Sequence, residues 1–429
     1  MEQMLVTTSA AEFWSKEARS FLGPLLNLAG TYAASDQVSH LRFFEEHIAP
    51  CLGPQPAEPQ VEYHASRALA GTRFEVSLNL TTRGKARVRY SFDLMRDGMG
   101  PDPFGEEKAR EMLHHLCSAT GGDARLMNHL METLFLSPSE TAALREKVKP
   151  QLHIPPAAIA FELEGPRQFM KVYIPVVRKT ALGKPSVEII MDALRGLEPL
   201  GYDLSYNMDL LDRYLTGCQG QVKPMMVGID CLDPTTHRDS RVKVYVHTES
   251  KTFATARDVI TLGGRLSDEF TLKKVDLLRS IWHLLLNEPN GGLDDNNGDG
   301  IDTWSKKERA PGTVFSGLLF TIDLAAGSGT PDIKTYVPVF QYAESTETVS
   351  RNTDAILKTL GHEWGQTGRF GEVTDAVLGG QKAYGQSYVT FTCTESKGVY
   401  LTSYFSRPIL NREQVPQGQA GKDAYNVMK

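Results

Sequence analysis

Pairs of segments with alternating polar and apolar residues recur along this chain, about every 70 to 80 residues, with helical stretches between them. The pairs fall within residues 72–94, 158–178, 222–248, 314–342 and 386–405. A short turn joins the two segments of a pair, and strands joined in this way run antiparallel. The pattern predicts an α+β fold in which about ten antiparallel strands close into a single barrel domain over residues 1–429, ringed by α-helices.

The stretches between the hairpins have the apolar spacing of helices. Ser9 begins an S-x-x-E capping box with Glu12, ahead of apolar residues at helical spacing. Further helices are expected within residues 38–48, 105–149, 185–216, 271–287 and 349–363. The apolar face of each strand would pack on these helices, and the polar face would line a lumen too wide for side chains to fill. Two separate α+β domains are the alternative that the pattern leaves open.

Several expected strands place a cation on one face, usually with a tyrosine two residues away. Side chains at i and i+2 of a strand share a face. The segments are Lys171-Val172-Tyr173, Arg241-Val242-Lys243-Val244-Tyr245, Lys334-Thr335-Tyr336 and Arg87-Val88-Arg89-Tyr90. For a single strand, a solvated outer face is the simpler explanation. Repetition of the same chemistry indicates cations that converge on one polyanion, such as a diphosphate, with Arg87 or Arg89 completing the set.

Tyrosines and one carboxylate accompany the cations. A tyrosine ring stabilises a nearby cation through its π-face, and its hydroxyl binds phosphate oxygens. The candidates are Tyr173, Tyr245, Tyr336, Tyr400 and Tyr404. Glu75 shares a strand face with Ser77 and Asn79, where a carboxylate inside a barrel binds an N–H group or accepts a proton. The alternative for Glu75 is an exposed position on an edge strand.

Composition narrows the function classes. The net charge is −6 and the pI is about 6.0, which disfavours nucleic acid as a partner. Five cysteines without a CxxC pair are typical of free thiols in a reducing compartment. The first residues do not read as a signal peptide, and no run approaches 18 apolar residues, so we expect a cytoplasmic protein and no membrane partner.

The sequence also predicts no bound metal and no cofactor. Asp295, Asn297 and Asp299 begin like a calcium-binding loop, but Lys306 stands at the twelfth position, where a bidentate Glu is required. No glycine-rich nucleotide-binding motif is present.

At this point the motifs together resemble the fungal aromatic prenyltransferases of the dimethylallyltryptophan synthase type. The resemblance covers nearly the whole chain and depends on the order and spacing of its motifs. They include the Trp14 helix, Leu52-Gly53-Pro54, Phe74-Glu75-Val76-Ser77-Leu78-Asn79, Lys171-x-Tyr173, Asp230 with the Arg241 to Tyr245 segment, Lys334-Thr335-Tyr336-Val337-Pro338, and Tyr400 with Tyr404.

The resemblance implies a ten-stranded barrel and a metal-independent reaction inside it. Dimethylallyl diphosphate would be the donor and an aromatic small molecule the acceptor. The donor diphosphate would be bound by Arg89, Lys171, Arg241, Lys243 and Lys334. The five tyrosines would shield the allyl cation, and Glu75 would hold the N–H of the acceptor, typically an indole.

Two departures from the family pattern bear on the acceptor. Members that prenylate tryptophan at C4 have a Lys about thirteen residues before the position of Lys171, where this chain has Pro155-Pro156-Ala157-Ala158-Ile159. They also have an Arg for the amino-acid carboxylate, where this chain has Met226-Val227-Gly228-Ile229. Both departures favour a tryptophan-containing cyclic dipeptide or an indole alkaloid over free tryptophan.

Other functions stay open at this stage. Tyrosine or a polycyclic phenol is an alternative acceptor, and a non-catalytic barrel that carries an anionic or aromatic small molecule is a different class altogether. A polyphosphate hydrolase would normally recruit a metal, for which no ligand cluster is evident. The sequence leaves the donor length, the ring position attacked and the oligomeric state open.

Overall fold

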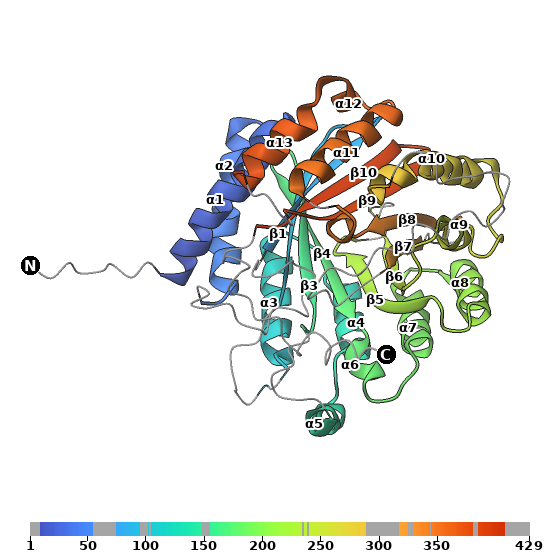
Figure 1. Ribbon diagram of the computed structural model, residues 1–429. Helices are drawn as coiled ribbons and strands as arrows, with labels where there is room; N and C mark the ends of the chain where they lie inside the picture. The colour runs from blue at the N-terminus through green and yellow to red at the C-terminus, as the bar shows by residue number, and fades with distance from the viewer. Residues whose placement is uncertain are drawn as a thin grey trace, which may run out of the picture.

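The computed structural model in Figure 1 describes residues 9–407, with gaps at 55–73, 95–101, 103, 148–154, 234–235, 238–239, 289–316, 325, 327–328, 344 and 381–384. The calcium-loop-like segment from Asp295 to Lys306 lies outside the described residues. None of the described helices has an 18-residue stretch apolar enough to cross a lipid bilayer.

Ten antiparallel strands form a closed barrel, which confirms the fold expected from the five hairpins. The strands are β1 (Phe74–Thr81), β2 (Arg87–Asp93), β3 (Ala158–Glu164), β4 (Arg167–Pro175), β5 (Lys223–Asp230), β6 (Val242–Thr248), β7 (Leu318–Leu324), β8 (Asp332–Val337), β9 (Gln386–Thr394) and β10 (Gly398–Phe405). Neighbours in sequence pair with each other, and β1 closes the barrel by pairing with β10 from Val76–Phe405 to Thr81–Tyr400. The barrel therefore has no edge strand.

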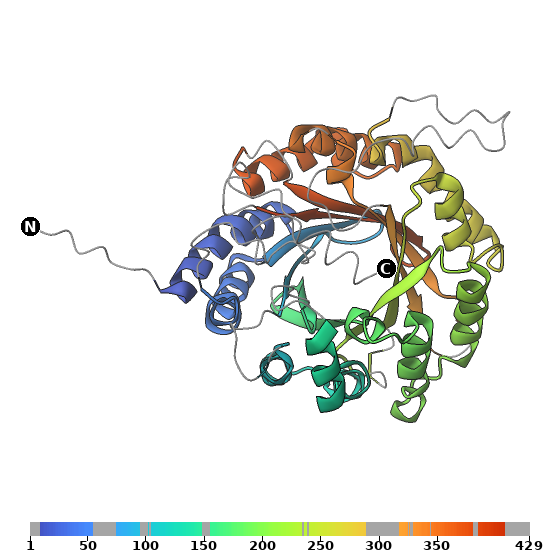
Figure 2. The ribbon, with the colours of Figure 1, turned by 60° about the horizontal axis from the view of Figure 1, so that its bottom comes forward.

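Helices surround the barrel on its outer face (Figure 2). They are α1 (Ala10–Ala29), α2 (Ala34–Phe43), α3 (Glu106–Ala119), α4 (Arg125–Leu134), α5 (Pro138–Lys147), α6 (Val177–Thr180), α7 (Ser186–Arg195), α8 (Ser205–Gly217), α9 (Phe253–Ile260), α10 (Glu269–Leu285), α11 (Thr346–Thr359), α12 (Trp364–Thr367) and α13 (Arg369–Leu378). Short turns of π or 3-10 helix are η1 (Phe44–Ile48), η2 (Ala49–Cys51), η4 (Glu198–Leu200) and η6 (Val339–Gln341). The expected capping box at Ser9 and Glu12 begins α1.

The sequence pattern predicted no helix at α9, α12 or α13. Each is short, and α9 and α13 are each close to a longer helix, α10 and α11. Thr252 begins α9, and its side chain accepts a hydrogen bond from the Thr255 amide. Such a single cap is a weak signal compared with the long apolar stripes of α1 and α10.

Alternation along β1 shows how the barrel separates its two faces. Phe74, Val76 and Leu78 pack into the apolar core between the strands and the helices, where Phe74 contacts the rings of Trp14, Phe21 and Phe44. Glu75, Ser77 and Asn79 take the opposite face, toward the barrel interior, and are also buried. A strand that is buried on both faces thus presents its polar residues to the lumen.

Tyr32, in the loop between α1 and α2, extends the pairing of two strands. The β2–β3 ladder ends at the Arg89–Glu162 pair. One step beyond it, the Tyr32 hydroxyl accepts a hydrogen bond from the Val88 amide at 2.8 Å and donates one to the Leu163 carbonyl at 2.8 Å. A buried hydroxyl therefore satisfies two backbone groups that the ladder leaves unpaired.

Tyr32→Phe should lower the free energy of unfolding by roughly 1–3 kcal/mol, because it leaves a buried N–H and a buried carbonyl without a partner. Urea denaturation followed by circular dichroism would measure the change. Tyr206→Phe is the matched control, since Tyr206 is 45% exposed and should be close to neutral. Equal stability of Tyr32→Phe and the control would contradict this role for Tyr32.

Candidate active site

The predicted cations all lie on the interior face of the barrel. Lys171, Lys243 and Lys334 are each less than a tenth exposed. Val172, Val244 and Thr335 alternate with them and face outward, the first two into the apolar core. The solvated outer face that could have explained each strand separately is therefore excluded for these three lysines.

Strand direction sorts the cations from the tyrosines along the barrel. On β4, β6 and β8 the cation comes two residues before the tyrosine, and each strand runs away from its hairpin turn. The cations therefore lie nearer the hairpin turns, and Tyr173, Tyr245 and Tyr336 lie nearer the opposite end. Glu75 lies toward that opposite end as well, because β1 runs toward its turn and Glu75 stands near its start.

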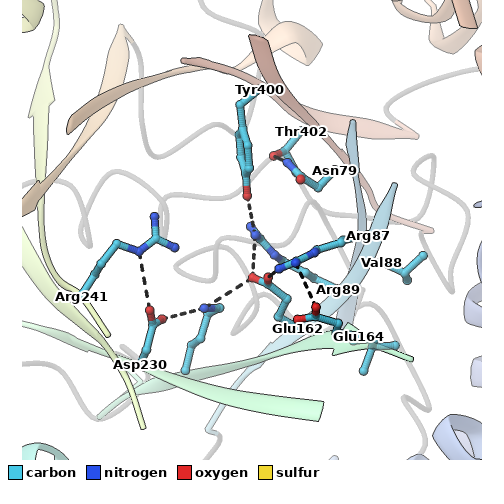
Figure 3. Close-up of polar contacts among 12 residues, drawn as sticks. Asn79, Arg87, Val88, Arg89, Glu162, Glu164, Asp230, Arg241, Tyr400 and Thr402 are labelled. Atoms are coloured by element: carbon cyan, nitrogen blue, oxygen red, sulfur yellow. Dashed lines mark hydrogen bonds and ion pairs between the residues drawn. The ribbon is translucent and has the colours of Figure 1, made fainter. Parts of the chain in front are cut away.

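Carboxylates alternate with the cations near the hairpin turns. Figure 3 shows the part of this set from Arg87 to Arg241. We call this set the charged row; it consists of Arg87, Arg89, Glu162, Lys171, Asp230, Arg241, Lys243, Asp323 and Lys334. Glu162 contacts Arg89 at 2.6 Å, Arg87 at 2.7 Å and Lys171 at 3.5 Å. The members of the charged row lie on or next to consecutive strands from β2 to β8. The charged row therefore runs around the inner side of the barrel wall.

Asp230 and Asp323 continue the charged row. Lys171 and Lys243 both bind Oδ1 of Asp230, at 2.6 and 3.0 Å, and Arg241 binds Asp323 at 2.9 Å. Burial raises the pKa of the Asp230 carboxyl, but the neighbouring cations outweigh burial and hold that pKa far below its usual range. Burial likewise opposes ionisation of Glu162, and Arg89 and Lys171 hold its pKa well below normal. Both carboxylates are therefore charged at neutral pH.

Arg89 and Arg241 have hydrogen-bonding capacity left. The Nε atom of each is buried and has no hydrogen-bond partner among the described residues. A buried donor without an acceptor costs free energy, and an incoming anion would supply the acceptor. Lys334 takes part in no ion pair among the described residues, and its Nζ lies 4.0 Å from the ring centroid of Tyr400. These groups suit the oxygens of a phosphate-containing ligand.

The Arg89 side chain is buried more deeply in the barrel interior than the Arg87 side chain. The Arg89 side chain is 13% exposed and donates a 2.5 Å hydrogen bond to the Tyr400 hydroxyl. The Arg87 side chain is 32% exposed and also pairs with Glu164 at 3.2 Å. This geometry supports the choice of Arg89, although the role of either residue in binding an anion stays a prediction.

Tyr400 links the cations to the tyrosines. Burial raises the pKa of its hydroxyl, but Arg89 and Lys334 lower it by more, so that the pKa of Tyr400 is lowered to about 7. The remaining tyrosines form a connected group of rings. Centroid distances are 5.7 Å for Tyr173–Tyr245, 6.0 Å for Tyr245–Tyr336 and 6.0 Å for Tyr336–Tyr404. The five predicted tyrosines thus share the interior face of the barrel.

Three interior residues were missed in the sequence. Tyr388 on β9 lies 6.4 Å from Tyr336 between ring centroids, and Glu162 and Asp323 are the carboxylates described above. Their strands do alternate, as in Phe161-Glu162-Leu163 and Ile322-Asp323-Leu324. Alternation alone does not single these residues out, because the partner of each side chain depends on the pairing register between strands.

Glu75 lies in the barrel interior, 7% exposed, between β10 and β2. The exposed edge-strand position considered as an alternative is therefore excluded. Ser387 on β9 donates a hydrogen bond to its Oε2 at 3.2 Å. Tyr404 lies close enough for the Glu75 charge to be among the causes that raise the tyrosine's pKa, after burial. A carboxylate in this position can accept a hydrogen bond from an acceptor N–H.

Apolar side chains form the wall near Tyr173 and Tyr245. Ala158, Ala160 and Met226 pack with these two rings, and Leu319 lies against the same cluster. The neighbouring barrel wall therefore offers little to a charged amino-acid group. Among the described residues, no three His, Cys, Asp or Glu side chains gather as a metal site would require.

Comparison with known proteins identifies the family. A family model described as tryptophan dimethylallyltransferase matches residues 10–370. Indole prenyltransferase tdiB of Emericella nidulans is 46% identical over 403 residues, which cover 93% of this chain and 96% of that protein. The chain belongs to this family.

Other relatives agree with that assignment. Indole diterpene prenyltransferase terF of Tolypocladium album is 31% identical to this aromatic prenyltransferase over 428 residues, covering 95% of this chain and 96% of that protein. The crystal structure of NotF in complex with brevianamide F and DMSPP has the same fold, with a TM-score of 0.74, 22% identity, and coverage of 96% of this chain and 98% of that chain.

Gly228 of this prenyltransferase makes room for two of the tyrosines. A Cβ atom added there would lie 2.7 Å from Cδ1 of Tyr173 and 3.3 Å from Cε2 of Tyr245. The first distance is shorter than any ordinary contact, so the Tyr173 ring would have to move. The two rings therefore owe their edge-to-face packing across β5 to the absence of a side chain at Gly228.

Gly228→Ala should displace Tyr173 while leaving the fold intact. If the ring excludes water from a reactive allyl cation, more of the donor will end as prenyl alcohol and less as prenylated acceptor. Chromatographic quantification of both products would give that ratio. Gly217→Ala is the matched control, since nothing lies within 4 Å of its added Cβ. An unchanged alcohol-to-product ratio in Gly228→Ala would contradict the shielding role.

Proposed function

We propose that this chain transfers a dimethylallyl group from dimethylallyl diphosphate to the indole ring of a tryptophan-containing cyclic dipeptide or an indole alkaloid, without a metal ion. The observation that carries the proposal is the arrangement of the barrel interior, with buried cations near the hairpin turns, tyrosine rings beside them and Glu75 toward the other end. Donor and acceptor groups thus have complementary surroundings in a single lumen. We further propose that residues 1–429 form one domain.

The cations would act on the leaving group. Arg89, Lys171, Arg241, Lys243 and Lys334 would bind the diphosphate oxygens. The allylic C–O bond breaks and its electron pair stays on the diphosphate, so negative charge grows there. Fixed positive groups stabilise that growing charge more than they stabilise the bound donor. This difference lowers the activation barrier for breaking the allylic C–O bond. These protein cations would supply the stabilisation that a metal ion supplies in other diphosphate enzymes.

The tyrosines and Glu75 would act on the cation and the acceptor. The π-faces of the tyrosines stabilise the allyl cation and exclude water, which would otherwise capture it. Glu75 would accept a hydrogen bond from the indole N–H and make the ring more electron-rich. A ring carbon then forms the new C–C bond, and a base takes up the ring proton, which restores aromaticity.

The apolar wall of Ala158, Ala160 and Met226 supports a neutral acceptor. The charged amino and carboxylate groups of a free amino acid would lose their hydration at that wall and gain no charged partner there. This desolvation costs several kcal/mol. Tyrosine or a polycyclic phenol is the second acceptor class, since a phenol O–H could also donate to Glu75. We also propose a cytosolic location, which the five free cysteines favour.

A mass-spectrometric assay tests the function. The purified protein would be incubated with dimethylallyl diphosphate and EDTA, together with tryptophan, tryptophan-containing cyclic dipeptides, tyrosine and polycyclic phenols. We expect a cyclic dipeptide to gain one prenyl mass, at a rate that added Mg²⁺ changes little. Turnover that stops in EDTA would contradict the metal-free mechanism, and donor binding without any product would favour a carrier.

Glu75→Gln should lower the rate of prenyl transfer at least about tenfold, because a charged hydrogen-bond acceptor for the indole N–H is replaced by a neutral one. Steady-state kinetics with saturating donor would measure the change. Glu46→Gln, an exposed glutamate outside the barrel, is the matched control. Turnover by Glu75→Gln that equals the control would rule out the assigned role.

Lys334→Ala should weaken the use of donor without disturbing a carboxylate, since Lys334 takes part in no ion pair among the described residues. Loss of one charge-assisted hydrogen bond corresponds to roughly 1.5–3 kcal/mol, or about a 10- to 160-fold fall in kcat/KM for the donor. The KM for the acceptor should change little. Lys16→Ala, on the exposed face of α1, is the control. A donor kcat/KM equal to that of the control would mean that Lys334 does not reach the diphosphate.

A further inference from the structure

One carboxylate joins two of the donor-binding lysines. Oδ1 of Asp230 accepts from Nζ of Lys171 at 2.6 Å and from Nζ of Lys243 at 3.0 Å. Its Oδ2 lies 3.7 Å from Nε of Arg241. Asp230 is 2% exposed, at the end of β5 between the strands that carry the lysines. Three cations from β4 and the start of β6 therefore meet at one buried acid.

Without this carboxylate the two ammonium groups would be hard to keep charged. Both bind the same oxygen, so they lie close together, and like charges at such a distance oppose protonation. Burial also favours the neutral amine. Burial lowers the pKa of Lys243, and Asp230 offsets part of this effect, so that the pKa is lowered to about 8. For Lys171, burial is outweighed by Asp230 and Glu162, and the pKa is raised.

We propose that Asp230 is a positioning residue, which holds the Lys171 and Lys243 ammonium groups side by side and protonated before the donor diphosphate arrives. The inference rests on the proposed diphosphate site and adds the group that keeps this site assembled. Asp230 acts through the lysines, since its oxygens are occupied by cations. Without Asp230, the two lysines would become protonated and adjacent only when diphosphate binds. Part of the binding free energy would then be used for this change, and the affinity for diphosphate would be lower.

Other charged groups also face these lysines, and they define the control. Around Lys243 and Lys171 lie Arg89 on β2, Glu162 on β3, Arg241 before β6 and Asp323 on β7. Asp323 is a buried interior carboxylate like Asp230, but its ion-pair partner is Arg241. A guanidinium stays protonated at any pH at which the protein is folded. Removing the Asp323 charge should therefore shift lysine protonation far less than removing the Asp230 charge.

Binding of inorganic diphosphate as a function of pH tests the proposal without acceptor or turnover. Isothermal titration calorimetry in EDTA would cover pH 6 to 10. The titrations of diphosphate itself and of Tyr400, whose pKa is lowered to about 7, are common to all variants. For the wild-type protein, affinity should fall as pH rises through about 8, where Lys243 loses its proton. In Asp230→Asn the fall should begin at lower pH.

The expected result is a change in shape of the pH profile. At pH 9, Asp230→Asn should bind diphosphate about tenfold more weakly than wild type, the effect of a pKa displaced downward by one unit. At pH 6, where both lysines are protonated in either protein, the affinities should be similar. In Asp323→Asn, the affinity for diphosphate should fall at nearly the same pH as in the wild-type protein. A purely structural defect would instead weaken binding equally at every pH.

Three results would overturn the proposal or the donor site on which it rests. Profiles of wild type and Asp230→Asn that run parallel would mean that Asp230 does not govern lysine protonation. If Asp230→Asn does not fold, Lys243→Arg decides, because an arginine at this position should keep diphosphate bound above pH 8. A fall at the wild-type pH in Lys243→Arg would show that Lys243 is not the titrating group. Absence of diphosphate binding to wild type would overturn the donor site itself.

Discussion

Buried positive charge is the constraint on which the rest of the barrel interior depends. Lys171, Lys243 and Lys334 are each less than a tenth exposed, and an isolated ammonium group in such a place costs several kcal/mol. The protein offsets this cost with Glu162, Asp230 and Asp323. The inner part of the charged row still has five cations, Arg89, Lys171, Arg241, Lys243 and Lys334, against these three carboxylates, so an excess of positive charge is left for an anion.

The strand architecture turns this charge pattern into a spatial order. A period of two places cation and tyrosine on the same face, and the common direction of β4, β6 and β8 places every cation nearer the hairpin turns. Because the barrel is closed by β1 and β10, Glu75 and the tyrosines of β10 lie on the same wall as Arg89 on β2. In the proposed reaction, diphosphate, allyl cation and acceptor would then follow one another along the lumen.

The sequence predicted the barrel and the residues that face its interior better than it predicted their contacts. Lys171, Tyr173 and Glu75 could be assigned to the interior face because each belongs to a strictly alternating segment. Glu162 was missed, although it also alternates, because its contact with Arg89 depends on the β2–β3 register. The space at Gly228 could not be anticipated, since it follows from how two side chains on neighbouring strands lie over β5.

A crystal structure with a non-hydrolysable thiolo analogue of dimethylallyl diphosphate, grown in EDTA, would test the central claim most directly. The account predicts diphosphate oxygens in contact with Lys171, Lys243 and Lys334, and the dimethylallyl group directed toward the rings of Tyr173 and Tyr245. Arg89 and Arg241 would donate the hydrogen bonds that their Nε atoms do not make among the described residues. Diphosphate bound away from the charged row would contradict the account.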